Sequence, residues 1–429
     1  MISEILILVI SFVVLLAIGV PVAWSIGLSC FFTMIASIDS LAAFTTVAQR
    51  MATGLDSFSL LAIPFFILAG QIMNQGGIAN RLIDFAKALI GALPGGLVYV
   101  NVIAAMLFGA ISGSAVAAAS AIGGILGKPM EKEGYSREFG AAINVTSSTT
   151  GLVIPPSNVL IVYSLASGGV SIASLFLAGY LPGILMGLAL MLVAAVWIKK
   201  KKYPAGTPTS FGKITATFFD ALPSLLLLVV VIGGIVSGIF TATEASGIAV
   251  LYCFVLSLIY RELDRKILYR VFLSSVGTTA IVMLLIATSM SMSWVMSYEN
   301  IPQSVSAALL SLSENKYVIL LIINLLLLFV GTFMDMTPAV LIFTPIFLPV
   351  MTNLGVDPVH FGIIMVMNLC VGLCTPPVGA VLFIGVGVAK TTIQKVIKPL
   401  IPLYVVMAIV LLLVTFIPAI SLWLPSLFE

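Results

Sequence analysis

Apolar runs of membrane-spanning length follow one another along almost the entire chain, and no other sequence feature limits the fold as strongly. A helix needs roughly 20 apolar residues to cross the hydrocarbon layer, and lipid offers no hydrogen-bond partner to a free backbone N–H or C=O group. Of the 429 residues, 61% are hydrophobic and only 8% are charged, which excludes a soluble enzyme and a disordered chain. The sequence therefore predicts an all-α polytopic membrane protein with about ten spanning helices.

The second half of the chain repeats the pattern of glycine, proline and polar breaks of the first half. Adding 221 to a position brings Gly151 onto Gly372 and Ser114 onto Asp335, and it also brings the first Pro-Pro pair onto the second. One ungapped offset that aligns glycine, proline and polar breaks indicates two copies of one unit. The predicted organisation is a first repeat at 1–200, a cytoplasmic linker at 201–221 and a second repeat at 222–429.

The apolar runs of each unit differ in length. The two around Ser114, and the two around Asp335, look too short to span separately, so we expect re-entrant hairpins at about 97–127 and 317–352. The segments that carry the proline pairs are expected to be helices broken in the middle, at 137–165 and 358–388. Five crossings per unit then remain, and an odd number inverts the second unit relative to the first. The other helices are predicted at about 4–20, 22–38, 57–75, 77–91, 172–198, 223–240, 243–260, 271–297, 301–312 and 400–424.

Charge placement supports this topology. If the N-terminus lies outside, all of the 19 Lys and Arg residues except Arg50 and Lys316 fall in segments predicted to be inside, as the positive-inside rule requires. Both termini are then expected to be periplasmic. The net charge of +3 is too small to indicate a nucleic acid as a partner.

Polar residues within the apolar runs gather at four places. They are residues 112–114 and 334–337 at the two hairpin tips, and 146–158 and 372–379 in the two broken helices. Unwound backbone at membrane depth is tolerated only where it is buried in protein or lines a cavity, so the four breaks should meet. Their hydroxyls and carbonyls suit a hard cation such as sodium, and they offer no soft or imidazole ligand for a transition metal. The alternative interpretation, ordinary kinks with serine and threonine back-bonding, suits one break better than four matched ones.

Two acidic residues lie within the apolar runs. Asp335 is expected at the second hairpin tip, where a carboxylate is costly unless a cation, a proton or water accompanies it. It could be a sodium ligand, a coupling residue or a structural partner of the tip. Glu244 follows Thr241 and Thr243, so we expect it to begin a helix.

Other patterns are weaker. Residues 123–128 lack the first glycine and the final Ser or Thr of a phosphate loop. Cys370 and Cys374 share a helical face but have no His or acid close by in sequence, so we interpret them as core residues. No Ser–His pair or H-E-x-x-H string is present. The sequence therefore predicts that the protein is not an enzyme.

Six motifs resemble the large membrane subunit of the tripartite ATP-independent periplasmic (TRAP) transporters, and the resemblance covers nearly the whole chain. They are Gly-Val-Pro-Val-Ala at 19–23, Ile-Pro-Phe-Phe at 63–66, Phe-Gly-Ala-Ile-Ser-Gly-Ser at 108–114, Gly-Leu-Val-Ile-Pro-Pro-Ser at 151–157, Gly-Thr-Phe-Met-Asp at 331–335 and Thr-Pro-Pro-Val-Gly at 375–379.

The resemblance implies a sodium-coupled importer of organic acids in the bacterial inner membrane. It implies two protein partners: a small membrane subunit of about four helices, expected here as a separate chain, and a periplasmic substrate-binding protein. It also implies an elevator-type transport mechanism, in which the hairpins and broken helices slide as one body past a fixed scaffold. Sodium is the only cofactor that the resemblance implies, with two or more ions expected.

The resemblance also assigns site residues. The first sodium site is expected at Ser112, Gly113, Ser114, Thr150, Gly151, Pro155 and Ser157. The second is expected at Met334, Asp335, Thr337, Gly372 and Thr375. Substrate is expected to contact Ser114, Asn158 or Thr337.

Among family cargoes, sialic acid is favoured and a C4-dicarboxylate comes next. Two other functions stay open. One is a stand-alone sodium-coupled organic-anion carrier or exchanger that needs no binding protein. The other is a membrane scaffold or receptor subunit that transports nothing, which four matched polar breaks at membrane depth disfavour.

Overall fold

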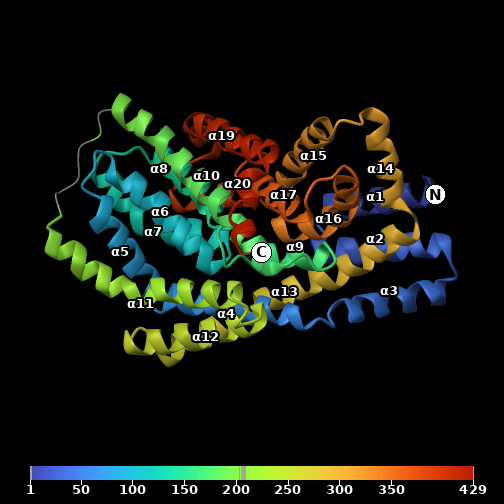
Figure 1. The fold of residues 1–429 in the computed structure, drawn as a ribbon, viewed down its shortest axis with the longest axis horizontal. Coiled ribbons are helices and arrows are strands. Elements are labelled where there is room, and N and C mark those ends of the chain that lie inside the picture. The colour runs from blue at the N-terminus through green and yellow to red at the C-terminus, as the bar shows by residue number, and fades with distance from the viewer. Residues whose placement is uncertain (1, 202, 204–208, 429) are drawn as a thin grey trace.

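The computed structural model describes residues 2–201, 203 and 209–428, and every regular element in those ranges is helical (Figure 1). Residues 202 and 204–208 of the predicted linker lie outside the described residues. The first half holds α1 (Ile2–Ala17), α2 (Val22–Ser37), α3 (Ser40–Gly54), a 3-10 turn (Phe58–Leu61), α4 (Ala62–Gln75), α5 (Ile78–Ile90), α6 (Gly96–Ser112), α7 (Ala115–Lys132), α8 (Arg137–Thr150), α9 (Asn158–Ala166) and α10 (Ile172–Lys201).

The second half holds the same kinds of helix in nearly the same order. Its elements are α11 (Phe211–Val236), α12 (Ala242–Ile259), α13 (Arg265–Tyr298), α14 (Ile301–Leu312), α15 (Lys316–Gly331), α16 (Met336–Asn353), α17 (Pro358–Leu373), α18 (Ala380–Val388), α19 (Ile393–Phe416), α20 (Ala419–Leu422) and a 3-10 turn (Pro425–Leu427). Seven described helices are long and apolar enough to cross a membrane, and several shorter apolar helices accompany them. The prediction of an all-α polytopic membrane protein is confirmed.

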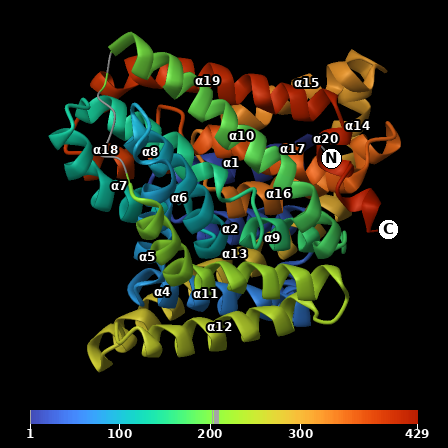
Figure 2. The same cartoon turned by 60° about the vertical axis from the view of Figure 1, so that its left-hand side comes forward.

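The helices form two groups, which we name by their contents. The frame group consists of α1–α5 and α11–α14, where α4 packs on α12 and α13, and α2 and α3 pack on α13. The hairpin group consists of α6–α10 and α15–α20. Figure 1 shows α3, α4, α11, α12 and α13 along one long side of the molecule, with most of the hairpin group across from them. Figure 2 shows α11 and α12 at one edge, facing the hairpin group.

Within the hairpin group, a short helix from each half packs against a helix of the other half. Helix α9 from the first half packs on α16, while α18 from the second half packs on α7. The Tyr163 hydroxyl on α9 donates a 2.6 Å hydrogen bond to the Pro358 carbonyl, at the start of α17. The thiols of Cys370 and Cys374, both buried, donate to the carbonyls of Thr149 and Val145 on α8. The two halves are thus joined through their interiors.

The two halves also make the same close contact at equivalent positions. A Cβ built on Gly151 would lie 2.5 Å from the Gly109 Cα, and a Cβ on Gly372 would lie 2.6 Å from the Gly331 Cα. In each half a hairpin arm therefore crosses the broken helix backbone to backbone, where only glycine fits. These contacts are the structural counterpart of the sequence repeat.

The sequence prediction differs most from the structure at three helices. Helix α3 was not predicted, because its polar residues interrupt the apolar pattern on which the prediction rests. Helix α11 begins at Phe211, inside the predicted linker, after the Ser210 hydroxyl accepts a hydrogen bond from the Lys213 N–H. Helix α19 begins at Ile393, seven residues (400 − 393) before the predicted start, because basic residues that read as loop form its first turns.

The prediction for Glu244 is confirmed. Its carboxylate accepts hydrogen bonds from the Thr241 N–H and hydroxyl, and the Thr241 hydroxyl accepts one from the Glu244 N–H. This reciprocal pair is a capping box at the start of α12.

Candidate substrate and ion site

The first hairpin tip is a sharp turn between α6 and α7. Gly113 has φ +61° and its N–H donates to the Gly109 carbonyl, so it ends α6 as a left-handed cap. Ser114 begins α7, and its hydroxyl accepts a 3.2 Å hydrogen bond from the Ala117 N–H. A Cβ on Gly113 would lie 2.6 Å from the Asn158 amide nitrogen. The tip therefore rests directly against the first residue of α9.

The first broken helix is buried throughout its interruption. Helix α8 ends at Thr150 and α9 begins at Asn158, with a cis Pro155–Pro156 bond between them. The Ser157 hydroxyl donates a 2.5 Å hydrogen bond to the Leu152 carbonyl. The Thr150 hydroxyl donates to the Ser147 carbonyl at 2.6 Å. The interruption is thus a compact loop held by its own hydroxyl groups.

The second hairpin tip lies between α15 and α16. Asp335 stands at the N-cap of α16 but makes no side-chain capping bond there, and its side chain is exposed. The Gly379 N–H donates a 3.1 Å hydrogen bond to the Thr332 carbonyl, which ties this tip to the second broken helix. Asp335 therefore stands at the start of α16 without capping it through a side-chain hydrogen bond.

The second broken helix is less enclosed than the first. Helix α17 ends at Leu373 and α18 begins at Ala380, again with a cis proline pair between them. The Thr375 hydroxyl donates a 2.7 Å hydrogen bond to the Val371 carbonyl, and the Tyr404 hydroxyl from α19 donates to the Cys374 carbonyl. Pro377 and Val378 are exposed, whereas residues 151–157 are all buried.

A cavity of about 210 Å³ lies between the two hairpin tips. Its walls come from both groups: α4 and α13 of the frame group, and α7, α9 and the two tips of the hairpin group. The lining residues are Ile63, Ile67, Gly70, Gln71, Asn74, Ser112, Gly113, Ser114, Ala117, Asn158, Val159, Val162, Thr278, Val282, Asp335 and Thr337.

The structure brings some of the predicted site residues to the cavity and leaves others behind it. All three residues predicted to contact substrate line the cavity, namely Ser114, Asn158 and Thr337. Six of the residues named for the site thus face this space, the others being Ser112, Gly113 and Asp335. The remaining ones, which do not line it, are Thr150, Gly151, Pro155, Ser157, Met334, Gly372 and Thr375. Met334 lies at the second hairpin tip. The other six lie in or beside the interruptions of the two broken helices.

Sequence reasoning missed the polar residues that the frame group contributes. Gln71 and Asn74 on α4 are half-buried, and Thr278 on α13 is exposed. Gln71 and Asn74 are three residues apart, so they share one face of an otherwise apolar helix. Two amides at that spacing were a signal that pointed to a polar cavity. Among the described lining residues, Asp335 is the only charged group.

Comparison with known proteins identifies the family. The family described as "Tripartite ATP-independent periplasmic transporter, DctM component" matches residues 9–420. The chain is 56% identical over 418 residues to the uncharacterized protein YgiK of Salmonella typhimurium, covering 97% of this chain and 96% of that one. It is 41% identical to the C4-dicarboxylate TRAP transporter large permease protein DctM of Pseudomonas aeruginosa, covering 94% of each. It is 38% identical to the sialic acid TRAP transporter large permease protein SiaM of Vibrio cholerae, covering 96% of each.

A solved structure shares the fold. The Alcanivorax borkumensis YdaH transporter superposes with a TM-score of 0.66 at 14% sequence identity, over 90% of this chain and 89% of that one. The family match spans nearly all of the chain, and the permeases that it resembles are transporters. The chain therefore belongs to the DctM family of tripartite ATP-independent periplasmic transporters, and it is a multi-pass membrane permease rather than an enzyme.

Proposed function

We propose that the protein is the large subunit of a sodium-coupled importer and that a small organic acid binds in the cavity between the hairpin tips. The cavity itself carries this proposal. It joins both tips, the start of α9 and two frame helices, and it is lined by hydroxyl and amide groups. Polar groups at that position are costly in a membrane protein unless water or a ligand satisfies them, so the cavity is a suitable place for the transported acid.

The charge of the cavity is the argument for sodium. An organic acid would bring a second negative charge next to the Asp335 carboxylate, and the described lining residues include no Lys, Arg or His. Two like charges at close range repel strongly in a region of low dielectric constant. Sodium bound at the tips would neutralise them, and it would make binding of the acid depend on the ion.

The ligands that we propose for sodium are the two sets expected from the sequence. Each set pairs one tip with the neighbouring break, and in each half the Gly–Gly crossing holds the two together. Both sets consist of hydroxyl and carbonyl oxygens, with a carboxylate added at Asp335. Oxygen ligands of this type suit a hard monovalent cation.

The lining favours a polyhydroxylated acid such as sialic acid over a C4-dicarboxylate. Gln71, Asn74 and Asn158 offer amide donors and acceptors, and Ser114 and Thr337 offer hydroxyls. Such groups match several substrate hydroxyls, whereas a second carboxylate would require a further cation. The similar permeases include one named for each cargo, so the preference for sialic acid rests on the lining alone.

The tripartite family implies a small membrane subunit and a periplasmic binding protein. We propose that the small subunit is a separate chain that covers helices α1, α2, α11 and α12, whose outer apolar side chains are exposed. Examples are Val13, Val229 and Leu251, at 55%, 65% and 64% exposure. The hairpin group would then stay free to slide past the frame group as an elevator, with both chain termini on the periplasmic side.

Uptake of labelled sialic acid into proteoliposomes that hold this chain with its small subunit tests the proposal. We expect uptake only when an inward sodium gradient and the binding protein are both present. Uptake that needs sodium but not the binding protein would identify a stand-alone carrier instead. A labelled C4-dicarboxylate serves as the second cargo, and its uptake in place of sialic acid would contradict the substrate choice alone.

A further inference from the structure

A second cavity of about 200 Å³ lies at the far end of the hairpin group from the substrate site. It is built where α7 ends, α8 begins and α18 ends, and it shares no lining residue with the first cavity. Ser114 and Lys128 lie at opposite ends of α7, roughly 20 Å apart at 1.5 Å per residue. This cavity therefore does not belong to the substrate site.

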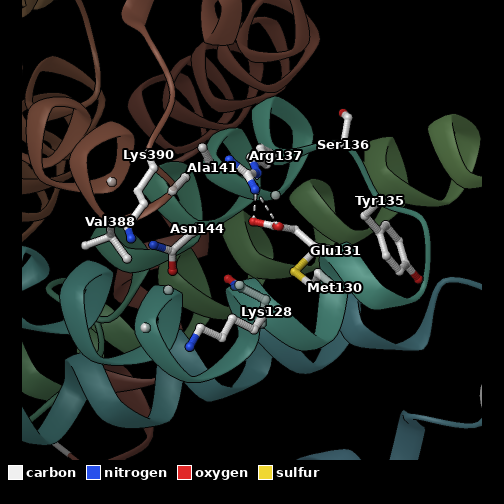
Figure 3. Close-up of a pocket in the computed structure, with 17 residues that line it drawn as sticks. Lys128, Met130, Glu131, Tyr135, Ser136, Arg137, Ala141, Asn144, Val388 and Lys390 are labelled. Carbon is white, nitrogen blue, oxygen red and sulfur yellow. Dashed lines mark hydrogen bonds and ion pairs between the residues drawn. The ribbon is translucent and has the colours of Figure 1, made fainter.

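Several basic side chains line this cavity. Lys128 lines it from α7 and Lys390 from the turn after α18, and no ion pair to either is found among the described residues. Arg137 also lines it, but the Glu131 carboxylate holds its guanidinium with two contacts of 3.0 Å. Figure 3 shows this pair on one side of the space and the two lysines on the other. The two lysine ammonium groups are thus available to bind an anionic ligand.

A buried amide lies in the wall between the lysines. Asn144 is 3% exposed, and its side-chain nitrogen donates a 2.7 Å hydrogen bond to the Ala119 carbonyl. Its Oδ1 atom has no hydrogen-bond partner in the part of the chain that the structure describes, and the residue lies between Lys128 and Lys390 in the view of Figure 3. A buried acceptor without a partner is costly, so it marks a place where a donor binds.

Lys390 occupies a backbone conformation that favours glycine. Its φ is +52°, and it follows the end of α18 in a left-handed cap. Residue 168, at the equivalent place after α9, is a glycine with φ +83°. The two caps use the same hydrogen bonds: Lys390 N–H to Gly387 O corresponds to Gly168 N–H to Leu165 O. A lysine in this position has a backbone cost that glycine would avoid. Arg261 has a similar φ of +57°, so the backbone supports a role for Lys390 only together with the cavity lining.

The related surface of the other half lacks the charges. A cavity lined by Ala166, Ser167, Pro345 and Pro349, among others, lies where α9 ends against α16, and none of its described lining residues is charged. Pro349 stands at the repeat position of Lys128. The positive-inside rule accounts for lysines at this end of the molecule, but it accounts for neither the buried amide nor the strained backbone.

We propose that this second cavity binds a phosphate group. The phosphate oxygens would accept hydrogen bonds from Lys128 and Lys390, and a P–OH or a neighbouring hydroxyl would donate to the Asn144 Oδ1 atom. The group can belong to the headgroup of an anionic lipid or to a free phosphate, because both offer this chemistry. The proposal does not depend on the transported substrate.

Thermal unfolding of the purified chain with its small subunit tests the proposal in two arms. The first arm adds inorganic phosphate to delipidated protein in detergent, against potassium chloride of equal ionic strength. The second arm compares nanodiscs of phosphatidylglycerol with nanodiscs of phosphatidylcholine. We expect the melting temperature to rise by about 1–2 °C at ten times the dissociation constant in at least one arm. The arm that responds identifies the source of the phosphate.

Variants separate this site from general charge effects. Lys128→Gln and Lys390→Gly should each abolish the rise, while Lys132→Gln, on the exposed last turn of α7 outside the cavity, should retain it. Lys390→Gly should also raise the melting temperature without phosphate, because glycine relieves the strained backbone, so its loss of response cannot come from misfolding. An equal rise in all variants, an equal rise with chloride, or no rise in either arm would overturn the proposal.

Discussion

At the scale of single residues, four glycines decide how closely the hairpins approach the broken helices. Gly109 meets Gly151 and Gly331 meets Gly372 with backbone against backbone. No side chain fits between them, so a methyl group at either crossing must push two helices apart. The sequence showed that Gly151 and Gly372 were equivalent, but it could not show that a second glycine faced each of them.

Gly372→Ala is therefore expected to destabilise the protein by about 1–3 kcal/mol, because the added Cβ would lie 2.6 Å from the Gly331 Cα. The melting temperature of the purified protein measures the change. Gly387→Ala on α18 is the matched control: nothing lies within 4 Å of its Cβ, so it should be neutral or stabilising by up to about 1 kcal/mol. Equal melting temperatures for the two variants would contradict the crossing.

Asp335 is the residue whose charge matters most in the proposed site. Asp335→Asn keeps the shape of the side chain but removes the carboxylate, so sodium-driven uptake should fall at least about tenfold, the equivalent of about 1.4 kcal/mol of lost ion binding. Initial uptake rates at several sodium concentrations measure the loss. Asp220→Asn, an exposed acid on α11 outside the cavity, should leave uptake unchanged. Unaltered sodium dependence in Asp335→Asn would remove the residue from the coupling site.

At the scale of elements, the halves exchange their short helices. Helix α9 packs on a hairpin of the other half, and α18 does the same in return. A side-chain hydrogen bond from α9 to the start of α17 joins the Tyr163 hydroxyl to the Pro358 carbonyl. Tyr163 is fully buried and Pro358 is half-buried, so the hydroxyl end of this bond is shielded from solvent.

Tyr163→Phe should lower the free energy of unfolding by about 1 kcal/mol, because it removes one buried hydrogen bond and leaves the Pro358 carbonyl without it. Thermal unfolding is again the measurement. Tyr298→Phe, on the 49% exposed Tyr298 at the end of α13, is the control and should have little effect. A melting temperature for Tyr163→Phe equal to that of the control would show that the exchanged packing is not held by this bond.

Element boundaries were predicted well where hydropathy changes abruptly and poorly where it does not. The hairpin tips and proline breaks fall between apolar stretches, and the structure interrupts its helices there. Helix α3 and the start of α11 carry polar residues at helix ends and outside the long apolar runs. There the helix depends on caps such as Asp39 and Ser210, which are weak signals in a sequence that is otherwise dominated by hydropathy.

At the scale of the whole molecule, the cavity between the hairpin tips lies at the boundary between the frame group and the hairpin group. Its walls come from the frame group on one side and from the hairpin group on the other. A Cβ on Gly70 of α4 would lie 3.0 Å from the Ser112 Cα, so the first tip rests against the frame in this state. An elevator movement would have to break that contact in every transport cycle.

A disulfide between Gly70→Cys and Ser112→Cys should stop transport if the first tip leaves the frame group during the cycle, because a Cβ on Gly70 would lie close to the Ser112 Cα in this structure. Uptake should be lost on oxidation and recovered on reduction. Each single variant, oxidised in the same way, shows the effect of the substitution alone, and the four native cysteines are buried. Undiminished uptake in the crosslinked protein would contradict movement between the two groups.

The helical membrane fold, the repeat, the polar breaks and the family can be predicted from the order of the residues, because lipid forces apolar runs into helices and polar breaks stand out among them. Helix packing in three dimensions shows which break faces which, that Gln71, Asn74 and Thr278 complete the cavity, and that Lys128 and Lys390 lie around Asn144. These are contacts between residues far apart in the chain, and they depend on how closely helices approach. A repeat in the sequence shows that two units are alike, but only the packing of the helices shows how the units fit together.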